Sequence, residues 1–207
     1  MAKILNGILG GGVGKVGGVV MSNWKGIDTL RAYSVPANPN SSAQQTQRTL
    51  FAAVLAFLRL ILTTVIQPYW DPFAVGQSGF NEAMSKNLLA WADDTAFDDA
   101  IVSQGNLEQE TITTATYNAT TGAVEIQWTP SGLGNGEDTD SAVGIMVDTG
   151  NNIAFALTGF QRSENLADGN IGADRTVGEI KAYLFFHRGS GATLEVSNSD
   201  YFQAVAP

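Results

Sequence analysis

WKGIDTLRAYSVPANPNSSAQQTQR, residues 24–48, joins three kinds of backbone in one short stretch. Its first part continues a β-rich run across a glycine-containing turn, which is typical of a hairpin. Pro36 and Pro39 then favour extended backbone at the residues that precede them. Ser41 or Ser42 is a good helix N-cap, and helix-forming residues follow. The stretch therefore predicts a junction between a β-hairpin and a helical body, and it holds no plausible catalytic set.

The residues before the hairpin, 1–18, form a glycine-rich segment. Glycine widens the accessible range of φ and raises the entropy of the free chain, so we expect an arm that orders only against a partner. The apolar contacts with that partner would come from Ile4, Leu5, Ile8, Leu9, Val13 and Val16.

Five residues of the opening stretch complete the predicted assembly surface. We expect Trp24 to anchor the hairpin and the Pro36–Pro39 segment to set its direction. Arg31 lies in the second half of the hairpin, and Arg48 is expected to tie the helix start back to it. If this interpretation is correct, replacing Trp24 damages assembly or folding and leaves no enzymatic phenotype.

Two helices are expected after the junction. The first runs from Ala43 to about Gln67, where Pro68 is expected to end it. The second fits residues 80–92. Apolar residues recur at helical spacing in both, and they predict two core stripes: Leu50, Val54, Leu58, Ile61, Leu62 and Val65 in the first, and Phe80, Met84, Leu88 and Trp91 in the second.

Beyond Asp99 the hydrophobic period changes to two, which indicates strands. We expect them at residues 101–102, 111–117, 123–129, 142–147, 153–161, 177–187 and 193–196. About seven short strands with turns between them are typical of an antiparallel immunoglobulin-like sandwich. In the sixth strand both faces are apolar, so it should be central or covered on both sides.

The expected fold class is therefore α+β, in three parts. Residues 1–40 form the assembly arm and hairpin, residues 41–99 the helical region, and residues 100–207 the β-sandwich.

Charge is divided unevenly along the chain. Residues 1–90 carry seven Lys/Arg and three Asp/Glu, a net +4, and residues 91–207 carry four and 17, a net −13. Such asymmetry is typical of head-to-tail contacts between copies, of a basic end facing nucleic acid, or of two domains with different surfaces. Because the basic residues are scattered, direct nucleic-acid contact is not expected.

Neither a secretory signal nor a membrane span is expected. The start of the chain has only a thin basic region and a glycine-broken apolar segment. The longest apolar run, Phe51–Ile66, is interrupted by Arg59 and is shorter than the roughly 20 residues that cross a bilayer.

The residue types that catalysis and metal binding require are scarce. There is no cysteine and one histidine, which excludes disulfides and thiolate metal sites. His187 has no evident nucleophile or carboxylate partner. Gly12–Gly17 matches the dinucleotide-binding pattern, but it lacks the strand before and the helix after that the motif needs. We expect no enzyme and no cofactor.

An acidic loop at residues 134–140 leaves a metal site open. Glu137, Asp138 and Asp140 are oxygen ligands of the kind that calcium prefers, although their order does not match a helix-loop-helix calcium loop. Acidic loops between strands are more often simply solvated.

The opening stretch carries a resemblance to a known family. The residues concerned are Gly14, Gly17, Trp24-Lys25-Gly26, Arg31, Pro36, Asn38-Pro39, Ser41, Ala43-Gln44-Gln45, Gln47-Arg48 and Phe51. With these residues the chain resembles a phage-associated family of unknown function that is common in Bacteroidota. Later residues look similar as well: Phe80-Asn81, Asn87, Trp128, Asp140, Tyr183, Phe185-Phe186, Val196-Ser197, Ser199 and Tyr201. The resemblance implies a virion structural protein and brings no active site with it.

Three functions follow as hypotheses. The first is a multi-copy virion structural protein of a tail, neck or capsid surface, whose arm lies on an adjacent subunit and adds strands to its sheet. Its partners would be copies of itself and other virion proteins, with no small-molecule substrate. The second is a self-assembling extracellular filament or surface protein. The third is a carbohydrate-binding sandwich in which Trp128, Tyr183 and Phe185 stack on sugars if they are exposed.

Overall fold

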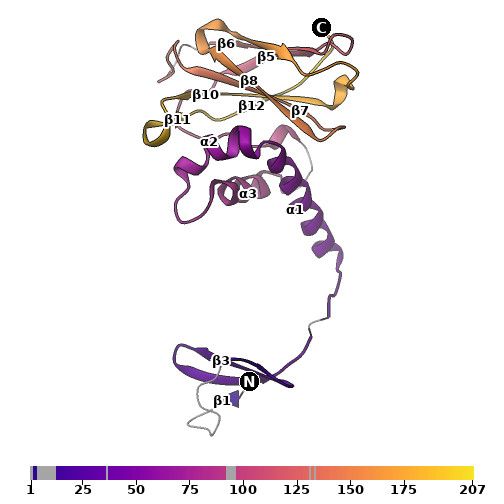
Figure 1. Cartoon of the computed structure of the whole chain (residues 1–207), viewed down its shortest axis with the longest axis vertical. Helices are drawn as coiled ribbons and strands as arrows, with labels where there is room; N and C mark the ends of the chain where they lie inside the picture. The colour runs from indigo at the N-terminus through magenta and orange to yellow at the C-terminus, as the bar shows by residue number, and fades with distance from the viewer. Residues whose placement is uncertain (1, 4–12, 36, 92–96, 131, 133) are drawn as a thin grey trace. The chain divides into compact units, whose positions relative to one another are not determined.

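The computed structural model describes residues 2–3, 13–35, 37–91, 97–130, 132 and 134–207. Contacts divide the chain into two compact units, Met1–Ser42 and Ala43–Pro207. The helical region and the β-rich region lie together in the second unit. Helices and antiparallel sheets occur side by side in that unit (Figure 1), so the α+β class is confirmed.

The first unit is a four-stranded antiparallel sheet in the order β1-β4-β3-β2. The strands are β1 (Ala2–Lys3), β2 (Gly14–Val16), β3 (Val19–Trp24) and β4 (Ile27–Ala32). The predicted hairpin corresponds to β3 and β4, which are joined by Lys25 and Gly26. Both turn residues have positive φ, 50° and 76°. Two consecutive positive φ values are what a type I′ hairpin turn requires, and its twist matches that of the strands.

Part of the predicted arm differs from expectation. Gly14–Val16 is paired with β3, with Val16 opposite Val19 and Gly14 opposite Met21. Gly17 has a φ of 57° in the intervening turn, a value that glycine adopts without a steric penalty. The glycines here close a second hairpin, so this end of the arm is ordered within its own unit.

The helical layer of the second unit bends where the sequence predicted one straight helix. Helix α1 spans Ser42–Leu60, and a π-helical turn, η1, follows at Leu62–Ile66. Ile61 has a ψ of 13° between them, and the axes of Ser42–Leu60 and Leu62–Phe73 differ by 66°. Pro68 does not end the helix, because it lies in the first turn of α2 (Gln67–Tyr69), where its missing N–H has no partner to lose.

The remaining helical elements are the 3-10 turn η2 (Asp71–Phe73), helix α3 (Gly79–Ala90) and the 3-10 turn η3 (Phe97–Asp99). Among the described residues, no single helix is both long and apolar enough to cross a membrane, whereas the bent pair passes that test by length and composition alone.

Two sheets form the β-rich part of the second unit. The first has the order β11-β10-β7-β8, with β12 also paired to β10, and the second has the order β5-β6-β9. Their bounds are β5 Thr111–Tyr117, β6 Ala123–Thr129, β7 Ser141–Asp148, β8 Ile153–Gln161, β9 Leu166–Asn170, β10 Ile180–Arg188, β11 Glu195–Val196 and β12 Asp200–Gln203. Three 3-10 turns, η4 (Arg162–Glu164), η5 (Val177–Glu179) and η6 (Gly191–Thr193), lie between them.

The strand predictions are partly wrong. Residues 101–102 form no strand, and the strands expected to start at residues 177 and 193 start later because η5 and η6 occupy those positions. Strands β9 and β12 were not predicted. The sequence of β9, LADGN, is poor in strand-forming residues, and it is extended because it pairs with β6.

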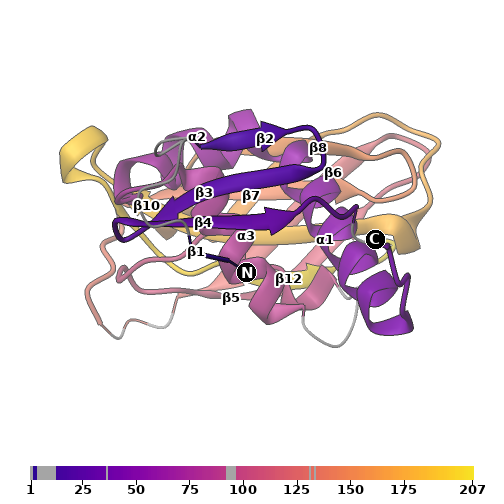
Figure 2. The same ribbon diagram turned by 90° about the horizontal axis from the view of Figure 1, so that it is seen from below.

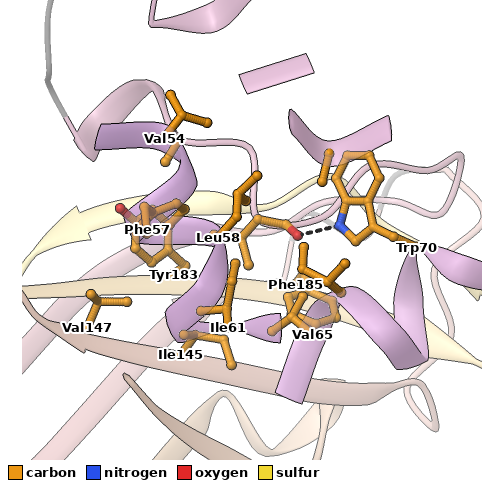
Figure 3. Close-up of a cluster of buried hydrophobic side chains, with 14 of the residues drawn as sticks. Val54, Phe57, Leu58, Ile61, Val65, Trp70, Ile145, Val147, Tyr183 and Phe185 are labelled. Atoms are coloured by element: carbon orange, nitrogen blue, oxygen red, sulfur yellow. Dashed lines mark hydrogen bonds between the residues drawn. The ribbon is translucent and has the colours of Figure 1, made fainter. Parts of the chain in front are cut away.

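Two hydrophobic cores lie on opposite faces of the larger sheet. Tyr183 and Phe185 of β10 belong to the core under the helices, and Leu184 and Phe186 to the core that faces the smaller sheet. The prediction that this strand is covered on both faces is confirmed. Figure 3 shows the helical core, in which α1 and η1 side chains meet those of β7 and β10: Val54, Phe57, Leu58, Ile61, Val65, Ile145, Val147, Tyr183 and Phe185. Figure 2 gives a second view of these layers.

Candidate assembly interface

The sheet of the first unit has two chemically different faces. Residues directly opposite each other on paired strands share a face. Val16, Val19 and Ala32 are aligned in this way, as are Gly14, Met21 and Leu30. We call the side formed by Val16, Val19, Met21, Leu30 and Ala32 the apolar face; the paired residues Asn23 and Asp28 lie on the same side, next to the Lys25-Gly26 turn.

The opposite side of this sheet mixes polar and basic residues with Val20. Lys15 and Arg31 lie on either side of Val20 in register. The Ser22 and Thr29 hydroxyl oxygens are 2.8 Å apart. Lys15 Nζ lies 3.4 Å from the centroid of the Tyr33 ring, within the range of a cation–π interaction. This side therefore carries more polar and charged groups than the apolar face, although Val20 and Ile27 also lie on it.

Side-chain hydrogen bonds hold the register of the central hairpin. Asn23 Nδ2 donates to Asp28 Oδ1 at 2.7 Å, and the Gly26 amide donates to Asn23 Oδ1 at 3.1 Å. A one-residue slip would move every side chain to the other face. These contacts oppose such a slip, and the apolar face is therefore a preformed surface.

No residue of the apolar face is fully buried within the part of the chain that the structure describes. Among the described side chains from residue 13 to residue 49, none is buried, and the first buried residue is Leu50. Val16 is 65% exposed, and Val19, Met21 and Leu30 are half-buried. A small one-layer sheet is marginally stable in water unless an apolar face packs against something. The face therefore has the properties of one half of an interface.

A tether follows the sheet. The described residues between 33 and 41 are all exposed, and they include Pro39. Pro39 favours extended backbone at Asn38, whereas Asn40 has a positive φ of 46°.

The structure brings together only some of the predicted assembly residues. Val16 joins the apolar face, Val13 precedes β2, and Arg31 lies on the opposite side of the sheet. Arg48 is exposed in the second turn of α1, in the second unit. The remaining predictions lie outside the described residues: Ile4, Leu5, Ile8, Leu9, Pro36 and the side chain of Trp24.

Sequence reasoning missed three main members of the apolar face, Val19, Met21 and Leu30. The signal that identifies them is the pair of two-residue turns, Gly17-Gly18 and Lys25-Gly26, because turn length fixes which residues oppose each other.

The two units carry opposite net charge. Residues 1–42 have four Lys/Arg and one Asp, a net +3, whereas residues 43–207 have seven Lys/Arg and 19 Asp/Glu, a net −12. Arginines of the second unit are largely occupied within it. Arg162, Arg175 and Arg188 pair with carboxylates at 2.5–3.2 Å. The second unit therefore carries a net negative charge, opposite in sign to that of the first unit.

In the acidic loop, where the sequence left a metal site open, arginine side chains contact two of the three carboxylates. Asp140 is contacted by Arg162 Nε at 3.2 Å and by Arg188 Nε at 2.6 Å, and Glu137 by Arg188 Nη1 at 3.0 Å. No group of three or more potential metal ligands was found within the described ranges. The loop carboxylates neutralise buried and half-buried arginines, which explains their clustering.

The aromatic residues considered for sugar binding lie in the cores. Trp128 is 3% exposed, and Tyr183 and Phe185 are fully buried. Trp128 Nε1 donates to the carbonyl of Arg162 at 2.9 Å. These three side chains are buried, so the exposure on which stacking against sugars depended is not found for them.

His187 lies at the end of β10, and its ring centroid is 5.0 Å from that of Tyr69. Burial lowers the pKa of His187, against smaller raising effects from Gly189 and Asp140. No serine hydroxyl is recorded in contact with it among the described residues. The neutral ring is a packing element of the helix-sheet interface.

Comparison with known proteins gives one match. The model of a family described as a family of unknown function (DUF6266) matches residues 11–203. The matched segment starts before β2 and ends with β12, so it covers strands of both units. No curated protein and no solved structure matches the chain.

Proposed function

This chain belongs to the DUF6266 family, whose function is unknown, and we propose that it is a structural protein that assembles in many copies through its first unit. In this proposal the apolar face of one copy docks on the acidic second unit of the next. The setting we propose is a bacteriophage virion, at a tail, neck or capsid surface, with other virion proteins as further partners.

The uncovered apolar face is the observation that carries the proposal. Burial of a side chain such as methionine or leucine contributes about 1.5–3 kcal/mol. Met21 and Leu30 face each other across β3 and β4, and each is only half-buried. A partner that covers this face therefore supplies the apolar burial that the one-layer sheet lacks.

The charge difference supports a second copy as the partner. A unit of net +3 is attracted to a unit of net −12, and each copy carries both. Lys15 and Arg31 lie on the side opposite the apolar face, so this attraction steers the approach of two copies and does not come from the apolar face itself. A contact between unlike surfaces of identical subunits is head-to-tail. In a pair formed in this way, one subunit still has a free apolar face and the other still has a free docking surface on its second unit. Such a contact generates rings or open filaments.

The segment between the two units is long enough for the sheet of one copy to reach a neighbouring copy. Residues 33–41 span roughly 30 Å when extended, at about 3.3 Å per residue.

The test uses two full-length variants of adjacent residues in β3. Met21→Glu places a carboxylate on the apolar face. Val20→Glu is the matched control, because it adds the same charge on the opposite side, between Lys15 and Arg31. Mass and shape are measured by light scattering after size exclusion and by electron microscopy, over a range of protein and salt concentrations.

We expect wild type and Val20→Glu to form assemblies that weaken with salt, and Met21→Glu to remain monomeric and folded. Loss of about 2 kcal/mol per contact weakens association by roughly 30-fold. A chain lacking residues 1–20 should behave as Met21→Glu does. A wild-type protein that is monomeric at every concentration, or a Met21→Glu variant that assembles normally, would overturn the proposal.

The location of the product distinguishes the virion from the alternative of an extracellular filament. Electron microscopy of the native source would find the protein on DNA-containing particles in the first case and in free fibres in the second. For the two-sheet part we also propose an immunoglobulin-like arrangement, supported by its antiparallel pairing and by the core between the sheets. An experimental structure would test it.

A further inference from the structure

A second candidate site lies in the second unit, in a cleft of about 330 Å³. Four separate segments line it: the end of η2, the stretch that precedes β5, the acidic loop and the start of β11. Figure 1 shows α2, which leads into η2, close to β11. We call this cleft the amide cleft, after three of its polar lining residues. The polar lining consists of Gln104, Asn106, Asn135 and Glu195.

Three polar side chains of the amide cleft, those of Gln104, Asn106 and Glu195, are available to a ligand. Gln104 and Asn106 are exposed, and within the described residues no hydrogen bond from either side chain is recorded. Glu195 is exposed over 58% of its side chain and is 3.8 Å from its nearest cation, Arg188 Nη1. Two amides and a carboxylate together offer donors and acceptors at short range.

The apolar part of the lining complements these groups. Phe73 lines the cleft and is 48% exposed, so its ring has a free surface. Leu107 and Leu194 are buried and form apolar lining beside it. The exposed aromatic ring can pack against C–H groups of a ligand, and the amide and carboxylate groups beside it can hydrogen-bond to hydroxyl groups. The cleft is therefore suited to a ligand that carries both.

The walls of the amide cleft are rigid. The Leu107 amide donates to the Val196 carbonyl at 3.1 Å, which ties two walls together. Asn135 Oδ1 accepts from the Glu108 amide at 2.9 Å, and its Nδ2 donates to the Asn106 carbonyl at 3.2 Å. Gly105 packs so closely that an added Cβ would lie 1.9 Å from the Val196 oxygen. A rigid lining reduces the entropy cost of binding.

We propose that the amide cleft binds a neutral sugar unit. Vicinal hydroxyls both donate and accept, as the amides of Gln104 and Asn106 do, and the Glu195 carboxylate accepts from two hydroxyls. The C–H face of the sugar packs on Phe73. The volume lies at the lower end of small-molecule sites, which fits one or two sugar rings. Because the only charged group in the lining is a carboxylate, anionic sugars are disfavoured.

This site is independent of assembly, because all of its lining lies in the second unit. It also differs from the sugar site expected from the sequence, whose aromatic residues are buried. The amide cleft is lined by polar side chains and a single aromatic ring, whereas the site expected from the sequence consists of three aromatic side chains.

The test uses the full-length protein against an array of neutral glycans, followed by titration calorimetry with the free mono- and disaccharides that the array identifies. Phe73→Ala and Glu195→Gln remove the stacking surface and the charged acceptor. Val75→Ala is the matched control for Phe73→Ala, since Val75 is 92% exposed, lies two residues away and does not line the cleft.

We expect millimolar or tighter binding of at least one neutral sugar, and loss of roughly tenfold or more with either cleft variant, the scale of one stacking contact or one charged hydrogen bond. Val75→Ala and the assembly variant Met21→Glu should bind the free sugar as wild type does. Absence of any bound neutral glycan, binding only of sialylated or sulfated glycans, or binding that both cleft variants leave unchanged would overturn the proposal.

Discussion

Replacement of Arg162 by methionine is expected to destabilise the second unit by about 4 kcal/mol. Arg162 is 3% exposed, and its Nη1 contacts Glu110 Oε1 at 2.5 Å, a carboxylate that is itself 2% exposed. Its Nη2 also donates to the Glu108 carbonyl at 2.7 Å. Methionine keeps most of the aliphatic packing but removes the charge and these donors.

The magnitude follows from what the substitution leaves behind. Removal of one partner of a buried ion pair typically costs about 3–5 kcal/mol, because the other charge stays buried without compensation. Asp140 keeps its contact with Arg188 at 2.6 Å, so Glu110 is the principal group affected. For a domain of this size, a loss of about 4 kcal/mol lowers Tm by roughly 8–16 °C.

The assay is urea unfolding of the full-length protein, followed by tryptophan fluorescence and far-UV circular dichroism. Arg59→Met is the control, since Arg59 is exposed on α1, and it should change the free energy of unfolding by less than about 0.5 kcal/mol. The double variant Arg162→Met/Glu110→Gln should recover a large part of the loss. A decrease in the free energy of unfolding of less than about 1 kcal/mol for Arg162→Met would refute the reasoning. It would show that the buried Glu110 carboxylate does not depend on the charge of Arg162 for its stability.

Two further predictions concern single polar side chains in the second unit. Burial holds the pKa of His187 in the folded protein below its usual value of 6.5. Between that lowered pKa and pH 6.5, the unfolded chain therefore binds more protons at His187 than the folded protein does. The stability attributable to His187 is therefore full above pH 6.5 and is lost as the pH falls from 6.5 toward the lowered pKa. The slope is at most about 1.4 kcal/mol per pH unit. Thermal unfolding of wild type and His187→Gln across pH 4.5–8 measures it, and equal slopes in the two proteins would contradict the assignment. Asn87→Leu should cost about 2–3 kcal/mol, since buried Asn87 donates to the Ile101 carbonyl at 3.0 Å and accepts from the Ile101 amide at 2.9 Å, which the variant leaves unpaired. Urea unfolding of Asn87→Leu beside the exposed control Asn81→Leu checks it, and equal losses in the two variants would count against the role of these hydrogen bonds.

Short-range patterns in the sequence account for much of the fold. The alternation in β10 predicts a strand covered on both faces, and its residues divide between the two cores as expected. The core stripe of α1 is also confirmed at Leu50, Val54 and Leu58. These patterns succeed because helical and strand periods place side chains on faces, and burial follows from the face.

Predictions from local signals were wrong where a tertiary contact outweighs them. Pro68 was read as a helix end, yet the chain bends at Ile61 and accepts the proline in a new first turn. Strand β9 has little intrinsic strand preference and forms through its pairing with β6. In both cases packing in the second unit provides more free energy than the local preference of the residues.

The sequence by itself determined the α+β class, the presence of the central hairpin with its glycine-containing turn, and the apolar stripes of the helices and strands. Tertiary structure decided which polar groups meet. Arg162 reaches Glu110 across 52 positions of the chain, and Asp200 accepts from the amide of Ile112 across 88. The amide cleft likewise joins residues from Phe73 to Val196. The physical reason is that periodicity reports only whether a side chain faces a core, whereas the partner of a buried charge and the lining of a cleft depend on how distant segments close on one another.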